Sequence, residues 1–377
     1  MSIEVRPITG EEHLAFIRDR GEASFLQTPA WAKVKPEWRG ESLGWFHGGD
    51  LIGAGLVLYR QLPKLPRYLA YLPEGPVLDW ARPDVGAQLD ALVAYARKKK
   101  AFAVRIGVAI PHRRWFASTI KDAVADDTIT RLSQVTPDVT EHVATRVIHQ
   151  LNHHGWRSEP DGEGFAAGQP KFNFQLPLVD DEGNQKTPES VLKGMNQLWR
   201  RNIKKAANMG VEVRTGTRAE LADFHRIYLE TAERDHFTGR SLAYFETMWD
   251  ALNAENPDRM KLYLAHHEGD LVAATTMVQV GTHSWYSYGA STNAKREVRG
   301  SNAVQWQMIQ DALAAGCRVY DLRGITEGVG SDDPEIGLIQ FKVGTGGEAV
   351  AYVGEWDYPI NHALYAGFNL YLKARSK

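Results

Sequence analysis

The sequence predicts an α/β protein of two tandem lobes, each containing a mixed sheet. With 377 residues, the chain is long for a single hydrophobic core, so two domains are expected. Strand-like and helical stretches alternate along the chain, which is typical of an α/β architecture. The same order of elements occurs once in each half. We therefore expect one lobe over residues 1–165 and a second over residues 166–377.

The first half contains two short helices, then a hairpin, a strand, a longer helix and a strand. Thr28 and Pro29 favour the start of the second helix, because threonine caps helices and proline suits a first helical position. The expected elements are helix 10–20, a helix after residue 29, strands 43–47 and 51–59, strand 68–72, helix 84–100 and strand 101–108.

The second half repeats this order. The expected elements are helices 221–235 and 244–253, strands 261–267 and 271–280, strand 284–290, helix 302–315 and strand 318–322. The repeat is also visible in the residues themselves. The run from His47 to Ala54 reads HGGDLIGA, and the run from His267 to Ala274 reads HEGDLVAA. Each run opens a hairpin, and the shared order around it favours an internal duplication.

Glycines and a proline between residues 150 and 200 predict a loop that joins the lobes: Gly162, Gly164, Gly168 and Pro170. A basic helix follows at residues 196–208. At helical spacing it places Arg200, Arg201, Lys204 and Lys205 on one face. That face is either a solvated helix surface or a surface that follows RNA phosphates, and both interpretations stay open.

The stretch from Tyr320 to Gly347 is the strongest candidate for chemistry. It begins with a strand-like alternation ending at Gly324, and a loop follows. A short apolar run, residues 336–341, then leads to Lys342 and a glycine cluster. Glycine lets a backbone approach a ligand closely, and a lysine suits a phosphate or a developing oxyanion. The alternative is a solvated lysine beside a hairpin turn.

Composition excludes several classes of protein. A formal net charge of −2 gives no overall nucleic-acid signature, so an RNA contact would be a local patch, and no DNA contact is expected. Cys317 is the sole cysteine, so no disulfide forms within the chain, as in a reducing compartment. The N-terminal residues do not read as a secretory signal, and no apolar run is long enough to span a bilayer. We expect a cytoplasmic protein that is able to work at a membrane surface.

Six motifs stand in a fixed order over nearly the whole chain. They are Gln27 to Lys35, Tyr71 to Pro76, Glu233 to Phe245, Trp285 to Ser291, Tyr320 to Ile325, and Phe341-Lys342. The ordered set resembles the Fem family of peptidoglycan-bridge aminoacyltransferases, and it is most similar to actinobacterial members that add the first glycine to a lipid-linked cell-wall precursor. The resemblance implies two lobes of the acetyltransferase (GNAT) type. No stretch sustains heptads, so the long coiled-coil arm of some members is not expected here.

The resemblance also implies the reaction. Family members take an amino acid from aminoacyl-tRNA and transfer it to an amine on the stem peptide of lipid II, or of its UDP-linked muramyl pentapeptide precursor. The implied donor here is Gly-tRNA, with alanine and serine left open. No metal or cofactor is expected, and the implied location is cytoplasmic, at the inner face of the cell membrane.

Site residues carry over from the matching motifs. Lys35 and Arg240 match residues that share the precursor's diphosphate, and two cations from different elements suit that ligand. Tyr244 matches a tyrosine lining the same site, although its helical spacing with Met248 also fits core packing. Tyr288 matches a tyrosine near the stem peptide.

Three further positions complete the expected site. Phe341 and Lys342 match the catalytic pair near the RNA end and the reacting ester, and Arg105 is assigned to substrate binding. The sequence departs from some relatives at Gly107, where those relatives have an acidic residue. A carboxylate base is therefore not expected at that position.

Two other classes of protein remain as alternatives. A coenzyme-A-dependent N-acetyltransferase would need a glycine-rich turn opening a helix, and residues 299–302 lack the expected pattern. A non-catalytic RNA-binding protein would use the basic helix but would leave Lys35 and Arg240 without a role.

Overall fold

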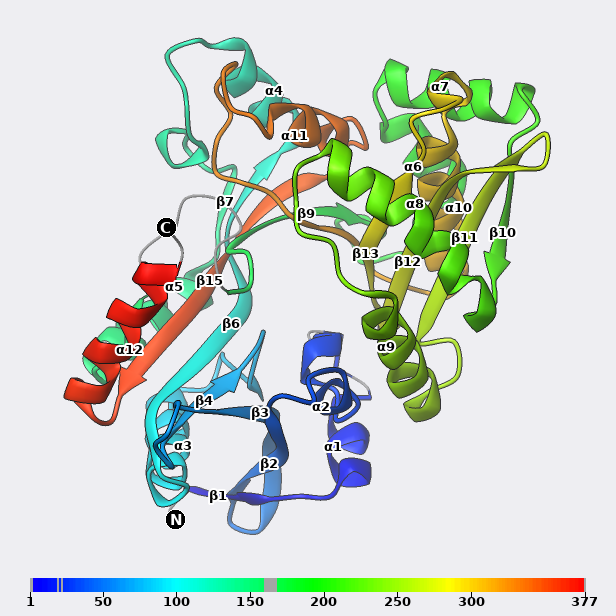
Figure 1. Ribbon diagram of the computed structural model, residues 1–377. Coiled ribbons are helices and arrows are strands. Elements are labelled where there is room, and N and C mark those ends of the chain that lie inside the picture. The colour runs from blue at the N-terminus through cyan, green and yellow to red at the C-terminus, as the bar shows by residue number, and fades with distance from the viewer. Residues whose placement is uncertain (1–2, 19, 22, 159–167, 376–377) are drawn as a thin grey trace. The chain divides into compact units, whose positions relative to one another are not determined.

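In the computed structural model, the chain forms two compact units, described for residues 3–18, 20–21, 23–158 and 168–375 (Figure 1). Unit 1 consists of Met1–Arg113, Val139–Lys171 and Ala351–Lys377, and unit 2 of Arg114–Asp138 and Phe172–Val350. The lobe boundary expected between residues 165 and 166 lies outside the described residues, as do Gly162 and Gly164. The C-terminal segment belongs to unit 1, whereas the sequence placed it in the second lobe.

Unit 1 contains a mixed sheet with helices from three parts of the chain. Two of its strands, β6 and β15, also contribute residues to unit 2. Its elements are β1 (Ile3–Pro7), α1 (Gly10–Ile17), η1 (Phe25–Gln27), α2 (Trp31–Val34), β2 (Arg39–His47), β3 (Asp50–Gln61), β4 (Tyr68–Leu72), β5 (Val77–Leu78), α3 (Val85–Lys98), β6 (Ala101–Phe116), β7 (Val139–Thr140), α5 (His142–His153), β8 (Arg157–Ser158), β15 (Glu348–Pro359) and α12 (His362–Arg375).

Unit 2 also combines a mixed sheet with flanking helices. Its elements are α4 (Ala117–Ala125), η2 (Leu132–Gln134), β9 (Phe172–Pro177), α6 (Pro188–Gly194), α7 (Gln197–Asn208), β10 (Glu212–Gly216), η3 (Arg218–Glu220), α8 (Leu221–Arg234), α9 (Leu242–Glu255), β11 (Met260–His267), β12 (Asp270–Val280), β13 (His283–Ser291), η4 (Arg296–Val298), α10 (Gly300–Ala314), β14 (Val319–Gly324) and α11 (Ile336–Val343).

The strand order is the same in both units. Unit 1 runs β1-β2-β3-β4-β6, and unit 2 runs β10-β11-β12-β13-β14. In each unit the first four strands pair antiparallel, and the last pair, β4 with β6 or β13 with β14, is parallel. A helix makes the crossover before the parallel strand, α3 in one unit and α10 in the other. This shared topology confirms the duplication expected from the sequence.

The two matching hairpins share their details. His47 pairs with Asp50 and His267 pairs with Asp270, so each turn has two residues, and both residues of each turn have positive φ. Such turns match the twist of the strands they join. Each hairpin also carries a bulge two residues before the end of its first strand, between Trp45 and Phe46 and between Ala265 and His266. Bulges are designed features, so a bulge at the same place in both hairpins adds to the case for duplication.

Helices cover both faces of the unit 2 strands (Figure 1). On one face, Phe224 of α8 and Phe245 of α9 pack with Leu262 and Leu264 of β11. On the other face, the Tyr263 hydroxyl donates to Asp311 of α10 at 2.7 Å. Neighbouring residues of β11 therefore point to opposite helix layers, as the two-residue period of a strand requires.

The core of unit 1 lies between its sheet and the helices α3 and α5. Trp45 is fully buried there, and its indole nitrogen donates to the carbonyl oxygen of Gln88 at 2.9 Å. In the described part of the chain, no helix is both long and apolar enough to cross a membrane.

Two local expectations from the sequence are wrong. Thr28 does not cap α2; its hydroxyl donates back to the carbonyl oxygen of Phe25 at 2.9 Å, and Ala30 occupies the cap position. The apolar run before Lys342 is not part of a hairpin but forms the helix α11. A short apolar run fits a buried helix as well as a strand, so periodicity alone could not decide between them.

Candidate active site

Lys342 lies near the C-terminal end of α11 and is only 3% exposed. Its Nζ donates to the carbonyl oxygens of Gly324 at 2.7 Å and Arg323 at 3.3 Å. Burial lowers the pKa of this ammonium to about 7. The alternative of a solvated lysine is therefore wrong.

Asp321 contacts the loop whose carbonyl oxygens accept the two hydrogen bonds from Lys342. Its side chain is 1% exposed and accepts from the Arg323 backbone nitrogen at 2.6 Å. This contact fixes Arg323 at a φ of 63°, in the left-handed region that residues other than glycine rarely adopt. Burial favours the neutral carboxyl, but hydrogen bonds from His283 and Gln175 and the charge of Arg323 hold its pKa below the usual value.

No role was predicted for Asp321 from the sequence, although one signal was present. An aspartate between two large apolar residues of a buried strand must have partners, because an unpaired buried charge is costly. We infer that Asp321 positions the loop that holds Lys342.

Phe341 packs against Trp199, with ring centroids 4.8 Å apart. The Trp199 indole nitrogen donates to the Phe341 carbonyl oxygen at 2.8 Å, so the contact is fixed at both side chain and backbone. Trp199 belongs to α7, the helix with the basic face. The tryptophan therefore connects the basic helix with the Phe341-Lys342 pair, a contact that the sequence analysis did not predict.

Protein atoms fill the space beside the glycines after Lys342, so these glycines do not let a ligand approach the backbone as the sequence suggested. A Cβ at Gly344 would lie 2.3 Å from the Trp199 side chain, and one at Gly347 would lie 2.2 Å from the carbonyl oxygen of Gln175. These glycines are needed for packing inside unit 2. Room for a ligand beside α11 must come from another side of the helix.

Arg240, Tyr244 and Tyr288 lie together in unit 2. The Arg240 guanidinium lies over the Tyr244 ring, 5.2 Å from its centroid, and the side chain is exposed. The hydroxyls of Tyr244 and Tyr288 are 3.2 Å apart. Burial, together with the neighbouring Tyr288, raises the pKa of Tyr244 above its usual range. Tyr244 thus both packs against its neighbours and supports the exposed arginine.

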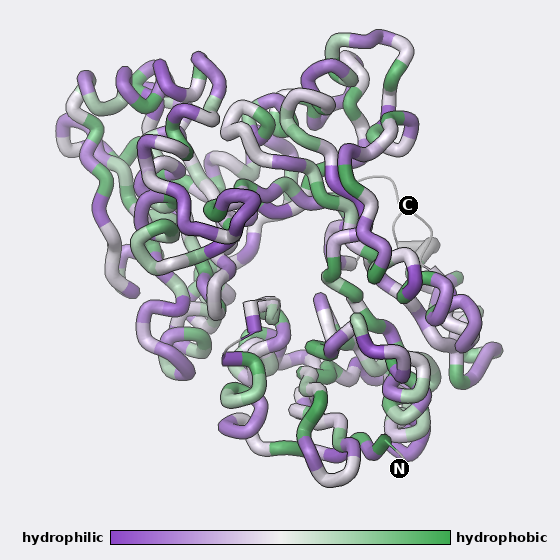
Figure 2. The backbone as a smooth tube through the Cα atoms, turned by 180° about the vertical axis from the view of Figure 1, so that it is seen from behind, coloured by the Kyte–Doolittle hydropathy of each residue, from purple (hydrophilic) through white to green (hydrophobic). Residues whose placement is uncertain are grey.

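The basic face of α7 is exposed at all four predicted positions, and hydrophilic residues occupy much of the helix (Figure 2). Arg200 differs from the other three. Its guanidinium donates to the carbonyl oxygens of Lys193 at 3.0 Å and Met195 at 2.5 Å, at the end of α6. Arg200 therefore satisfies a helix C-terminus, while Arg201, Lys204 and Lys205 have no recorded partner among the described residues.

Two predicted site residues lie in unit 1. Lys35 follows α2 directly, is half-buried, and has its Nζ 5.7 Å from the centre of the Trp31 ring. Arg105 on β6 is 8% exposed and binds Asp357 through two hydrogen bonds of 2.7 Å each. The sharing of a diphosphate by Lys35 and Arg240 and the binding of substrate by Arg105 stay predictions.

The partners of Arg105 form a buried charged cluster. Its Nη1 lies 3.6 Å from Glu355, and the Tyr71 hydroxyl donates to the same carboxyl at 2.5 Å. Burial raises the pKa of Glu355. Asp357 is 0% exposed and also accepts from the Tyr365 hydroxyl at 2.7 Å. The contacts of Arg105 resemble those of a structural ion pair.

Gly107 has a structural reason to be glycine. A Cβ at this position would lie 2.6 Å from the backbone nitrogen of Glu74. The Gly107 nitrogen also donates to the carbonyl oxygen of Gly75 at 3.1 Å. An acidic side chain would therefore require the neighbouring loop to move. Within the described residues, no group of three or more His, Cys, Asp and Glu side chains is arranged to hold a metal ion.

The repeated topology defines the fold: two tandem lobes with the arrangement of the acetyltransferase (GNAT) type. A tandem GNAT protein from the clavulanic acid biosynthesis pathway superposes with a TM-score of 0.51, at 11% identity, covering 95% of this chain and 99% of that one. The crystal structure of FemX superposes with a TM-score of 0.79, at 22% identity, covering 96% of this chain and 99% of that one. The model of the FemAB family matches residues 8–268 and 258–373, and the chain belongs to that family.

Curated relatives match over most of their length. The lipid II:glycine glycyltransferase of Staphylococcus epidermidis strain ATCC 35984 is 23% identical over 426 residues, covering 96% of this chain and 94% of that protein. The protein of the same name from Staphylococcus aureus strain MRSA252 is 23% identical over 432 residues, with the same coverage of each chain.

Proposed function

We propose that this protein is an aminoacyltransferase of peptidoglycan bridge synthesis. It takes an amino acid from aminoacyl-tRNA, with glycine as the first candidate, and transfers it to the stem-peptide amine of lipid II or of its nucleotide-linked precursor. Membership of the FemAB family and the lipid II:glycine glycyltransferases among its relatives support this function.

The observation that carries the proposal is the environment of Lys342. A buried lysine held by two backbone carbonyls is pre-positioned, so little reorganisation is needed when charge develops nearby. In its charged form it would stabilise the oxyanion that appears when the amine attacks the ester carbonyl. The C–N bond forms in that attack; the carbonyl is then restored as the bond to the ribose oxygen breaks, and the amine's proton passes to the departing oxygen or to solvent.

The acceptor is bound through its diphosphate. Arg240 supports this assignment because its guanidinium is exposed, lies over an aromatic ring, and has no recorded carboxylate partner in the described part of the chain. An arginine so placed suits bidentate binding of a phosphate. Because lipid II is membrane-bound, the enzyme acts at the inner face of the cell membrane as a peripheral protein.

The test offers three radiolabelled donors to the purified enzyme in separate reactions: glycyl-tRNA, alanyl-tRNA and acetyl-coenzyme A. Lipid II and UDP-muramyl pentapeptide serve as the two acceptors. The proposal expects label from a charged tRNA in the acceptor peptide. Label from acetyl-coenzyme A alone would instead identify an N-acetyltransferase, and RNA binding without any transfer would identify a binding protein.

A further inference from the structure

Two large apolar side chains of unit 2 are exposed close to Arg240. Leu229 on α8 is 48% exposed, and Phe237, in the loop after that helix, is 42% exposed. A single exposed apolar side chain is ordinary, but apolar side chains that gather beside a candidate ligand-binding cation indicate a binding surface. We call Leu229 and Phe237 the apolar surface.

Tyr228 joins the apolar surface to Arg240. The rings of Phe237 and Tyr228 pack with their centroids 5.6 Å apart, and the Tyr228 hydroxyl accepts from the Arg240 backbone nitrogen at 3.5 Å. Burial raises the pKa of Tyr228, and the nearby charge of Arg240 opposes that rise. A Cβ at Gly239 would lie 3.2 Å from the Leu229 side chain. Leu229, Phe237 and Arg240 are therefore neighbours in space.

The end of α8 fixes the position of Phe237. His236 has a φ of 56°, and the Phe237 backbone nitrogen donates to the carbonyl oxygen of Ala232 at 3.1 Å, as in a Schellman motif. An apolar residue at this position commonly packs against the last turn of the helix. That contact explains why an apolar residue is present, but it explains neither the exposed part of the phenyl ring nor the exposed Leu229.

The diphosphate of the acceptor carries a second group, which has to lie close to the diphosphate site. The muramyl peptide is bonded to one phosphate and a carrier to the other. In the nucleotide-linked precursor the carrier is uridine, which is polar, and in lipid II it is a polyprenyl chain. The side chains of Leu229 and Phe237 offer no hydrogen bonds, so they suit the hydrocarbon chain, whose removal from water is favourable.

We propose that Leu229 and Phe237 bind the first isoprene units of the acceptor's chain and thereby select the lipid-linked acceptor over the nucleotide-linked precursor. The inference rests on the proposed function, in which Arg240 binds the acceptor's diphosphate. The arginine holds the charged group, and the apolar surface holds the part of the chain that is bonded directly to it.

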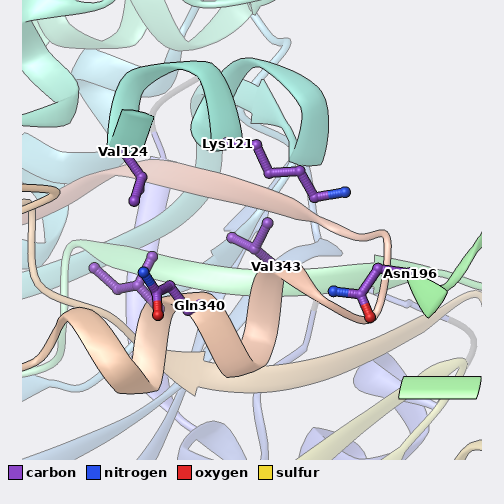
Figure 3. Close-up of a pocket in the computed structure, with 6 residues that line it drawn as sticks. Lys121, Val124, Asn196, Gln340 and Val343 are labelled. Carbon is purple, nitrogen blue, oxygen red and sulfur yellow. The ribbon is translucent and has the colours of Figure 1, made fainter. Parts of the chain in front are cut away.

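A pocket of about 190 Å³ beside α11 is an alternative site for a hydrocarbon chain in the same unit (Figure 3). Its lining residues are Lys121, Val124, Asn196, Ile339, Gln340 and Val343. None of these residues lies on α8 or in the loop that leads from α8 to Arg240. The contacts around Tyr228 therefore favour the apolar surface over this pocket.

The test measures equilibrium binding of three acceptors that share the muramyl pentapeptide and the diphosphate. One carries a chain of three isoprene units, one a methyl group and one uridine. Neither detergent nor vesicles are added, so the comparison reports the chain itself and not a bilayer. The wild type should bind the prenyl acceptor about tenfold more tightly than the methyl acceptor, because burial of a few methylene groups has an effect of this size.

Paired variants locate the effect. The double variant Leu229→Ser/Phe237→Ser should bind the prenyl acceptor as weakly as the methyl acceptor, with unchanged affinity for the uridine acceptor. Leu65→Ser/Phe116→Ser is the matched control, since these two side chains are 45% and 44% exposed and lie between β3 and β4 and at the end of β6. Val124→Phe fills the pocket beside α11 and should also keep the wild-type preference.

Equal binding of the prenyl and methyl acceptors by the wild type would overturn the inference, and so would an unchanged preference in the double variant or a lost preference in Val124→Phe. An equal loss of affinity for all three acceptors in the double variant would show that the apolar surface only supports Arg240. In each of these cases, transfer from charged tRNA to an acceptor by the wild type would keep the proposed function. Absence of transfer to all three acceptors would remove the proposed function, and the assignment of an acceptor site with it.

Discussion

A lysine with a pKa near neutrality should make the activity of this protein depend on pH. If Lys342 acts as a cation, kcat/KM for charged tRNA should fall as pH rises through about 7, because that ratio reports the free enzyme. A bound phosphate favours the charged form, so the falling limb of kcat should lie at higher pH. Steady-state rates between pH 6 and 9 test this, with Lys193→Met as the control at an exposed lysine. If kcat/KM of the Lys342→Met variant still fell as pH rose through this range, the titrating group would be another residue.

Lys342 should also make the free energy of unfolding depend on pH. Its pKa is about 7 in the folded chain and 10.5 as the ordinary value, so between these limits the unfolded state binds more protons. The free energy of unfolding should therefore rise with pH across this window, by about 2 kcal/mol between pH 7 and pH 9. Lys342→Met should lack that gain and be more stable than wild type at pH 7. Urea denaturation at both pH values measures it, and parallel changes in the two proteins would contradict the lowered pKa.

Arg240 should act on acceptor binding. Arg240→Ala removes a charged donor to the diphosphate, and one such contact contributes about 1.5–3 kcal/mol. We expect KM for lipid II to rise while KM for charged tRNA stays close to wild type. Arg218→Ala is the matched control, since Arg218 is another exposed arginine of unit 2 but pairs with Asp250. An unchanged KM for lipid II in Arg240→Ala would sink the diphosphate assignment.

At the level of elements, the cations of α7 should divide into two groups. Replacing Arg201, Lys204 and Lys205 with Gln should weaken binding of charged tRNA and flatten its dependence on salt, because fewer counterions are released. Arg200→Gln should instead loosen the end of α6, since Arg200 donates to two carbonyl oxygens there. Titrations at several salt concentrations compare the slopes. A triple variant with the wild-type slope would mean that this face is merely solvated.

Long amphipathic elements were predictable from the sequence, and α11 was not. The helices α3, α8 and α9 show clear helical periods, and their predicted positions agree with the structure within a few residues. The run before Lys342 is short, mostly apolar and close to glycines, so no period distinguishes helix from strand. Because Lys342 lies on this helix, its burial could not be predicted either. The contact between Arg105 and Asp357 could not be predicted either, because the two residues are 252 positions apart in sequence.

At the level of the whole molecule, the pair of Arg105 and Asp357 should support unit 1 strongly. Removing one partner of a buried ion pair costs about 3–5 kcal/mol, because the other charge stays buried. We expect Asp357→Asn to lower the free energy of unfolding by several times more than Asp250→Asn, whose carboxylate pairs with Arg218 at the surface. Denaturant titration of both variants compares the losses. Equal losses would show that the buried pair contributes no more than the exposed one.

The division of the chain into units also sets an order of events during protein synthesis. The first residues of unit 1 leave the ribosome before those of unit 2, but this unit also contains Ala351–Lys377, which are made after all of unit 2. Unit 2 already has its full set of residues when Val350 emerges. Domains generally fold as units during translation, the N-terminal one first. We expect the order to be reversed here: the N-terminal part of unit 1 lacks Ala351–Lys377 during synthesis, so unit 2 should fold before unit 1 is complete.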